Sequence, residues 1–263
     1  MNDFEPILRP ADHPLVSLEM LEGPVARLTL RDVERRNALR IELSLDIEAA
    51  VHSASASDAR ALILTSSSPV FCSGGDLDDL VTPRASLSDI ARGANALATS
   101  AVPTIAVIDG AVIGAGINLA LACDVIICSP RATFDPRLLD LGVHPGGGQL
   151  RDLSLRIGRQ GAVALSLLGE ALDGNDAASV GLAWRCVPSE ELMDLALTYA
   201  SRAASRPHEA MIRAKATLDA TISTDRDRAI AIELEQQQWS IEQPWIAERV
   251  ADLRDRLARR STR

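Results

Sequence analysis

DGAVIGAGINLALACD, residues 109–124, joins an apolar strand pattern to a helical pattern through a turn of very small residues. The strand pattern is PTIAVIDGAV (103–112), and the helical pattern runs through INLALAC (117–123). DVIICS (124–129) then has the continuous apolar character of a buried strand. Strand, helix and strand in this order predict an α/β fold.

The residues before this stretch continue the same alternation. VSLEM (16–20) and VARLTL (25–30) alternate apolar and polar residues, as the two strands of a half-buried hairpin would. Apolar residues recur at helical spacing over 41–55, and RALILTS (60–66) is typical of a buried strand. The residues from Leu87 to Ser100 predict another helix.

The residues after about Glu190 carry no strand pattern. Helical stretches follow, and the last of them, WIAERVADLRDRLARR (245–260), is strongly amphipathic and rich in arginine. We therefore expect an α/β core over residues 1–195 and a helical module over residues 196–263. Such a module could serve the assembly of several copies, or its helices could simply cap the same core.

The composition narrows the possible partners. A net charge of −9 argues against a nucleic-acid partner, which needs a basic face. No stretch approaches the ~20 apolar residues of a membrane span. The acidic start MNDFEPILRPADHP (1–14) is unlike a secretory signal, so a cytoplasmic location is expected. The cysteines and histidines are scattered, and they predict no metal site.

Two loops place small residues between an apolar strand and a helix. They are VFCSGGDL (70–77) and the turn within 109–124. Amides at a helix start point outward without intrahelical partners, so two of them converging on one oxygen would form an oxyanion hole. The alternative is that both are ordinary tight turns. Cys72, in the first loop, could be a nucleophile, although a buried neutral thiol is the simpler interpretation.

A dinucleotide-binding oxidoreductase is a second interpretation of the turn in 109–124. However, Asn118 stands where a G-x-G-x-x-G fingerprint needs its third glycine. No acidic residue ends a strand at the distance that ribose binding requires. The fingerprint is therefore incomplete.

Five segments in order resemble the enoyl-CoA hydratase/isomerase (crotonase) family. ERRNALRIEL is similar to the family's R-x-N-A-L segment, VFCSGGDL to F-x-A/S-G-x-D-L, and GAVIGAGINLALACD to G-x-A-x-G-G-G-x-E-L-A-L-A-C-D. FDPRLLDLGVHPGGG resembles the segment that ends in L-G-x-x-P-G-x-G-G. The last segment is EALDGNDAASVGLAWRCVPSEEL, followed by RPHEAMIRAKATL.

The resemblance implies a spiral of ββα units followed by helices that mediate trimers, often paired into hexamers. It also implies a bent acyl-CoA or enoyl-CoA thioester, whose carbonyl oxygen would lie between the amides of Gly75 and Ala115. Coenzyme A would be part of the substrate, and no separate cofactor is implied. The residues expected to line the substrate are Arg36, Ala38, Ser73, Gly75, Asp76, Leu77, Ala115, Asn118 and Leu138.

The sequence departs from the family at both catalytic glutamates. The first position is Asn118, whose amide cannot take a proton from water at neutral pH. The second is Leu138 or, on the other alignment, Arg137. Because a general acid or base contributes about 10²–10⁴ in rate, ordinary hydration is expected to be slow. The reaction could instead be isomerisation, decarboxylation, thioester hydrolysis or slow hydration.

Other groups nearby could replace the missing carboxylates. We expect Asp140 and His144 to be the substitute acid–base groups, with Asp135 a third candidate. The alternatives are a solvated Asp140 and a packing or capping His144. Phe71, Trp239 and Trp245 could line an acyl pocket or simply pack in the core. A non-catalytic acyl-CoA carrier or sensor is the second hypothesis for the whole chain.

Overall fold

The computed structural model describes residues 15–261, and the chain divides into two compact units, Met1–Ser205 and Arg206–Arg263. The N-terminal stretch used above to judge a signal sequence lies outside the described residues. The described strands are β1 Val16–Met20, β2 Val25–Leu30, β3 Ala61–Ser66, β4 Val70–Cys72, β5 Thr104–Ile108, β6 Ala111–Ile113, β7 Val125–Cys128, β8 Thr133–Asp135, β9 Leu172–Asp173 and β10 Arg185–Cys186.

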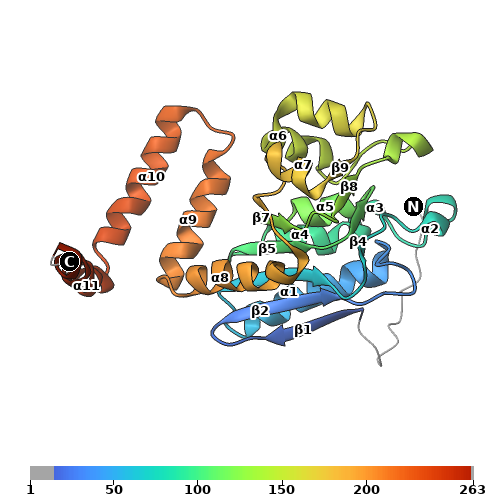
Figure 1. Cartoon of the computed structure of the whole chain (residues 1–263). Coiled ribbons are helices and arrows are strands. Elements are labelled where there is room, and N and C mark those ends of the chain that lie inside the picture. The colour runs from blue at the N-terminus through green and yellow to red at the C-terminus, as the bar shows by residue number, and fades with distance from the viewer. Residues whose placement is uncertain (1–14, 262–263) are drawn as a thin grey trace. The chain divides into compact units, whose positions relative to one another are not determined.

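Helices connect and cover these strands (Figure 1). The helices of the first unit are α1 Ile41–Ala56, α2 Leu77–Val81, α3 Leu87–Ile90, α4 Arg92–Ala98, α5 Gly116–Leu121, η1 Leu138–Leu141, α6 Gln149–Ser166, α7 Gly174–Ser179, η2 Ser189–Glu191 and α8 Leu192–Ala204. Those of the second unit are α9 His208–Thr221, α10 Arg226–Ile241 and α11 Trp245–Ser261.

The first unit contains two sheets, and the chain visits them in turn. The larger sheet has the strand order β1-β2-β3-β5-β7-β10, and the smaller has the order β4-β6-β8-β9. Each of the pairs β3–β4, β5–β6 and β7–β8 gives one strand to each sheet and then leads into helices. This repeat is the expected spiral of ββα units. The hairpin predicted at 16–30 is confirmed by the antiparallel pairing of β1 with β2.

Helices cover both faces of the larger sheet. Because successive side chains of a strand point to opposite faces, the covered strands place apolar residues on both. On β3, Ala61 and Ile63 belong to the cluster that α8 completes, whereas Leu62 and Leu64 belong to the cluster that contains the buried residues of α1. Helix α8 contributes Leu192, Ala196, Ala200 and Ala204, spaced four apart so that they share one face.

Helix α8 therefore completes the core of the first unit. The predicted boundary at 195/196 lies inside α8, whereas the compact units divide after Ser205. The helical pattern in the sequence continues across Pro207 from α8 into α9. The start of that pattern therefore does not mark where the core of the first unit ends.

Two predicted elements are divided in the structure. Residues 103–112 form not one strand but β5 and β6, which lie in different sheets. The chain bends at Asp109–Gly110, where a side chain on Gly110 would collide with the Pro69 carbonyl. Residues 87–100 form α3 and α4, separated at Ala91. Local periodicity detects the extended or helical character of these stretches but not their breaks.

The second unit has its own aromatic contacts. The ring centroids of Trp239 and Trp245 lie 5.9 Å apart in an edge-to-face arrangement, and the Arg213 guanidinium lies 4.0 Å from the Trp239 ring centroid. These tryptophans thus contact each other at the junction of α10 and α11. Among the residues that the structure describes, no helix is long and apolar enough to cross a membrane.

Candidate active site

The smaller sheet brings three loops together at one edge. Strands β4, β6 and β8 are parallel neighbours, with Cys72 beside Val112 and Ile113 beside Asp135. The carboxyl ends of parallel neighbours lie at the same edge of a sheet. The loops that follow these strands start at Ser73, Gly114 and Pro136, so they emerge side by side.

The first two loops are in close contact. A Cβ atom on Gly74 would lie 2.8 Å from the Ile113 carbonyl oxygen and 3.6 Å from the Ala115 nitrogen. Gly74 also has φ +95°, a value that glycine adopts without strain. On the other side, a Cβ on Gly116 would lie 2.7 Å from the Cys72 carbonyl oxygen. Glycine at both positions lets the two backbones approach each other.

The peptide units that carry the candidate donors are anchored at their carbonyl ends. The Leu39 N–H donates to the Gly74 oxygen at 2.7 Å, and Gln149 Nε2 donates to the Gly114 oxygen at 2.9 Å. In each trans peptide the following N–H points the opposite way from the carbonyl. The N–H groups of Gly75 and Ala115 donate to no acceptor among residues 15–261. Two oriented donors are therefore available from neighbouring loops.

Asn37 holds the strand that leads into the first loop through side-chain hydrogen bonds. Its side chain is fully buried, and Nδ2 lies 2.9 Å from Ser66 Oγ, 3.0 Å from the Val70 oxygen and 3.1 Å from the Phe71 oxygen. Its backbone has φ +54°, which asparagine tolerates better than most residues. The sequence motif contained Asn37, but nothing in the local pattern indicated that its side chain reaches Ser66 and the start of the first loop.

The remaining residues predicted around the first loop differ in exposure. Ala38 is buried, whereas Ser73 and Asp76 are half-buried. Arg36 is exposed, and Leu77, at 66% relative exposure, points much of its side chain to solvent. Asp76 caps α2 by accepting from the amides of Asp78 and Asp79. Its carboxylate therefore stabilises the N-terminus of α2.

Asn118 lies on α5 and its amide is engaged on both sides. Nδ2 donates to the Gly146 oxygen at 2.9 Å, and Oδ1 accepts from Gln149 Nε2 at 3.0 Å. Gln149 is 1% exposed and begins α6. The structure thus links the second loop to the glycine-rich turn 146–148 through two side-chain amides. Sequence analysis did not identify Gln149 as part of the site.

The two alternative positions for the second carboxylate have different surroundings. Leu138 is half-buried, and its Cδ2 would lie 3.6 Å from a Cβ on Gly114. Leu138 is thus the residue beside the second loop. Arg137 is exposed and pairs with Asp135, and this ion pair raises the pKa of Arg137. Asp135 is buried, and its carboxylate is engaged by that pair.

The predicted substitute bases lie on the exposed side of the third loop. Asp140, in η1, is exposed, and so is His144. His144 Nδ1 lies 2.7 Å from the Pro145 carbonyl oxygen. Both residues belong to the loop that starts at Pro136.

Cys72 is fully buried at the end of β4. Burial raises the pKa of the Cys72 thiol to about 12, so the thiol stays neutral at physiological pH. The neutral form is a poor nucleophile. Phe71 is 1% exposed and packs in the core with Val112 and Phe134, so it serves packing rather than a pocket wall.

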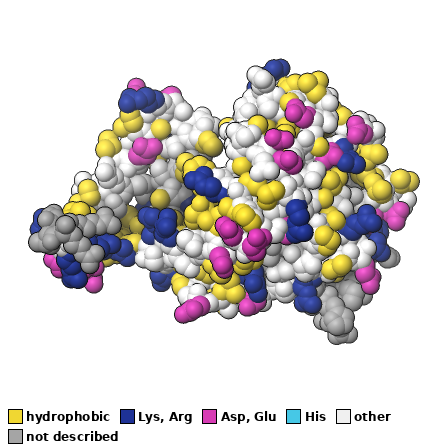
Figure 2. Space-filling view, in the orientation of Figure 1, with side chains coloured by type: hydrophobic (Ala, Val, Ile, Leu, Met, Phe, Trp, Pro, Cys, Tyr) yellow, Lys and Arg dark blue, Asp and Glu magenta, His cyan; other side chains and the backbone are white. Residues whose placement is uncertain are grey.

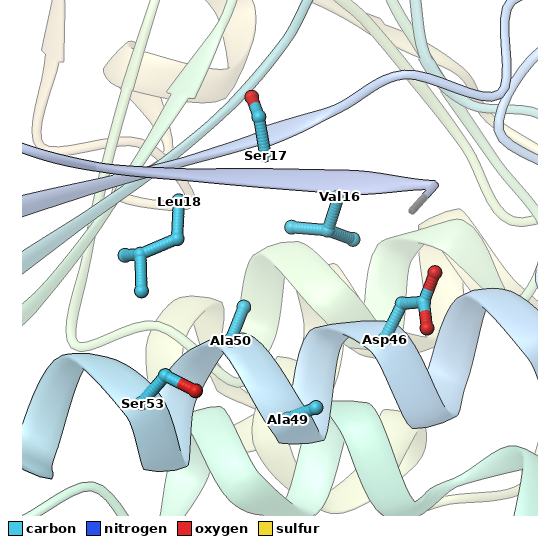
Figure 3. Close-up of a pocket in the computed structure, with 7 residues that line it drawn as sticks. All are labelled: Val16, Ser17, Leu18, Asp46, Ala49, Ala50 and Ser53. Atoms are coloured by element: carbon cyan, nitrogen blue, oxygen red, sulfur yellow. The ribbon is translucent and has the colours of Figure 1, made fainter. Parts of the chain in front are cut away.

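A separate cavity lies away from these loops (Figure 3). It has a volume of about 380 Å³ between β1 and α1, and it is lined by Val16, Ser17, Leu18, Asp46, Ala49, Ala50 and Ser53. None of these residues belongs to the three loops. On the face shown in Figure 2, basic and acidic side chains are interspersed with apolar ones.

The sequence profile of the enoyl-CoA hydratase/isomerase family matches residues 21–248. Together with the two-sheet spiral and the paired loops, this match defines the class: the chain belongs to the enoyl-CoA hydratase/isomerase family. It is 37% identical over 241 residues to the Mycobacterium tuberculosis "Probable enoyl-CoA hydratase EchA14", covering 86% of this chain and 93% of that one. A Rhodobacter capsulatus relative with the name "Probable enoyl-CoA hydratase" is 32% identical, over 83% and 86% of the two chains.

Solved structures share the fold. The enoyl-CoA hydratase from Polaromonas sp. JS666 superposes with a TM-score of 0.85 at 26% identity, covering 92% of this chain and 97% of that one. A Thermobifida fusca YX chain, solved in complex with acetoacetyl-CoA, superposes with a TM-score of 0.79 at 25% identity over 87% and 95% of the two chains. The predicted α/β fold with C-terminal helices is thereby confirmed.

Proposed function

We propose that this protein binds an acyl-CoA or enoyl-CoA thioester and stabilises negative charge on the thioester oxygen with the amides of Gly75 and Ala115. The observation that carries the proposal is the pair of anchored peptides. The Gly74 carbonyl is held by Leu39 and the Gly114 carbonyl by Gln149 and Ile117, and the N–H groups of Gly75 and Ala115 have no acceptor among the described residues. The acetoacetyl-CoA complex of the Thermobifida fusca relative supports the substrate class.

The physical basis is selective stabilisation of charge. Removing an α-proton from a thioester, or adding a nucleophile to its double bond, moves charge onto the carbonyl oxygen. Donors fixed in advance stabilise that charge more than they stabilise the neutral substrate, and each contributes about 3 kcal/mol. Both donors are main-chain N–H groups, so alanine in place of the family's glycine at position 115 keeps the second donor. Coenzyme A enters as part of the substrate, and no separate cofactor is proposed.

The reaction is proposed to be other than rapid hydration. Asn118 supplies no carboxylate, and its amide is already bonded to Gly146 and Gln149. Leu138, the residue beside the second loop, is apolar. Asp140 and His144 stay the proposed substitute acid–base groups, because they lie on the third loop at the same edge of the smaller sheet.

A non-catalytic acyl-CoA carrier or sensor is the second candidate. The bonded amide of Asn118 favours it, because a site with two oxyanion donors and no adjacent base can bind a thioester without converting it. Assembly into trimers or hexamers and a cytoplasmic location stay predictions.

One experiment separates the two candidates. Acetoacetyl-CoA binding is measured by calorimetry, and hydration of crotonyl-CoA and proton exchange at the α-carbon of butyryl-CoA in deuterated water are followed on the same sample. Binding with α-proton exchange supports the enzyme. Exchange that is lost in both Asp140→Asn and His144→Ala supports the substitute bases. Binding without any turnover supports the carrier, and absence of thioester binding overturns both.

A further inference from the structure

Gln149 reaches the second loop through a contact that the family pattern does not contain. The pattern L-G-x-x-P-G-x-G-G, matched from Leu141, ends in glycine where this chain has Gln149. Asn118 is also a departure from the pattern, and the two side chains hydrogen-bond to each other. The two departures therefore form one structural unit.

The orientation of the Gln149 amide is fixed by its partners. The Gly114 carbonyl oxygen can only accept, so the Gln149 atom 2.9 Å from it must be the nitrogen Nε2. The second hydrogen of Nε2 then faces the Asn118 atom at 3.0 Å, which must be the oxygen Oδ1. Asn118 Nδ2 consequently faces the Gly146 oxygen, as observed. One carbonyl thus sets the direction of the whole chain of hydrogen bonds.

The side-chain oxygen of Gln149 takes no part in this chain of hydrogen bonds. Oε1 is buried and has no hydrogen-bond partner among the described residues. A buried unpaired oxygen is unfavourable, and an apolar side chain at this position would avoid it. The side chain therefore contributes through its two donors.

The Gly114 carbonyl accepts from Gln149 Nε2 at 2.9 Å and from the Ile117 N–H at 3.2 Å, and it belongs to the same peptide unit that carries the Ala115 N–H. A trans peptide is planar, so holding its carbonyl oxygen fixes the direction of its N–H. A hydrogen bond to the carbonyl also polarises the peptide and strengthens its N–H as a donor. The geometry points to Gln149 as a positioning residue for the oxyanion hole: it orients and polarises the Ala115 N–H toward the thioester oxygen. This inference rests on the proposed function.

The test uses acetoacetyl-CoA, whose bound enolate is measured by its ultraviolet absorbance. Gln149→Met keeps the length of the side chain and removes both donors. We expect it to lower the ratio of bound enolate to bound keto form about tenfold relative to the wild-type protein, with less change in the dissociation constant. Gln160→Met, at an exposed position of α6 beyond the kink at Gly158, is the matched control and should equal the wild type.

Two further variants isolate the contact. Asn118→Ala removes the Asn118 branch and leaves the bond to Gly114, so its effect should be much smaller than that of Gln149→Met. In Gln149→Glu, the protonated carboxyl can donate to Gly114 and the ionised carboxylate cannot. Its enolate ratio, divided by the wild-type ratio at each pH, should therefore fall as the pH rises. This comparison is made within one folded variant, should Gln149→Met not fold.

The outcomes are distinct. If wild-type protein binds no acetoacetyl-CoA, or binds it without enolate, the proposed function fails and this inference with it. If the wild type shows enolate and the Gln149 variants match it at every pH, the positioning role is wrong while the proposed function stands. Equal losses in Asn118→Ala and Gln149→Met would also overturn the role, because Gln149 would then act through Asn118.

Discussion

The turns that carry Gly75 and Ala115 each have a backbone hydrogen bond to the carbonyl before the amide, but only the second turn has a side-chain hydrogen bond as well. The Gly74 carbonyl accepts from the backbone of Leu39, whereas the Gly114 carbonyl accepts from the backbone N–H of Ile117 at 3.2 Å and from the side chain of Gln149 at 2.9 Å. A backbone anchor persists through any side-chain substitution that keeps the fold. The additional side-chain anchor of the Gly114 carbonyl is lost in a single substitution at position 149, while the bond from Ile117 remains. The second amide is therefore the one that sequence changes can adjust.

Ala115→Pro tests the two amides separately, because it removes the N–H of Ala115 and leaves that of Gly75. Ala115 has φ −66°, which proline adopts without strain, so the substitution removes the N–H while keeping the local backbone. The enolate ratio of bound acetoacetyl-CoA should fall about 10²–10³-fold, the usual effect of losing one oxyanion donor. Ala115→Gly keeps the N–H and should stay within a few-fold of the wild type; equal enolate in the proline variant would exclude this amide.

Restoring carboxylates on the second and third loops tests whether their absence limits hydration. The double variant Asn118→Glu with Leu138→Glu should raise the rate of crotonyl-CoA hydration by about 10²-fold, because a general base and acid would return beside the same amides. Asn118→Gln with Leu138→Gln matches it in size and carries no base. Equal rates in the two double variants would show that the missing carboxylates are not what limits hydration.

The contact between the two loops is tested by adding one methyl group on either side. In Gly116→Ala the new Cβ would lie 2.7 Å from the Cys72 carbonyl oxygen, and the free energy of unfolding should fall by about 1–3 kcal/mol. In Gly75→Ala the Cβ meets nothing within 4 Å, and the expected change is within about 0.5 kcal/mol. Urea unfolding measures both. Similar values for the two variants would argue against close packing of the loops.

The pH dependence of the free energy of unfolding tests whether water reaches the Cys72 thiol at the contact between the two loops. Burial raises the pKa of Cys72 from 9.0 to about 12, so between these values the unfolded chain releases a proton that the folded chain keeps. This contribution to stability is complete below pH 9 and is lost as the pH rises, at about 1 kcal/mol per pH unit. Urea unfolding between pH 8 and 11 should show a steeper loss in the wild type than in Cys72→Ala. Parallel curves would mean that the thiol is hydrated.

The sequence by itself determined the family, the α/β fold with a helical C-terminal part, and the two small-residue turns. These are local properties: apolar periodicity reports whether a segment is extended or helical, and glycine marks places of close approach. The absence of both carboxylates was also visible, because Asn118 lies within a motif of fixed spacing and neither alignment of the second position, Leu138 or Arg137, gives a carboxylate.

Only the tertiary structure decided which groups meet. Gly74 and Gly114 are 40 residues apart, and their contact follows from the parallel pairing of β4 with β6, which no local pattern encodes. The same holds for Gln149, whose side chain reaches Gly114 across 35 residues. The break of residues 103–112 into strands of two sheets likewise coincides with the close passage of Gly110 past Pro69, which lies 41 residues earlier in the chain. Periodicity describes a segment, whereas a site is made by the packing of several segments.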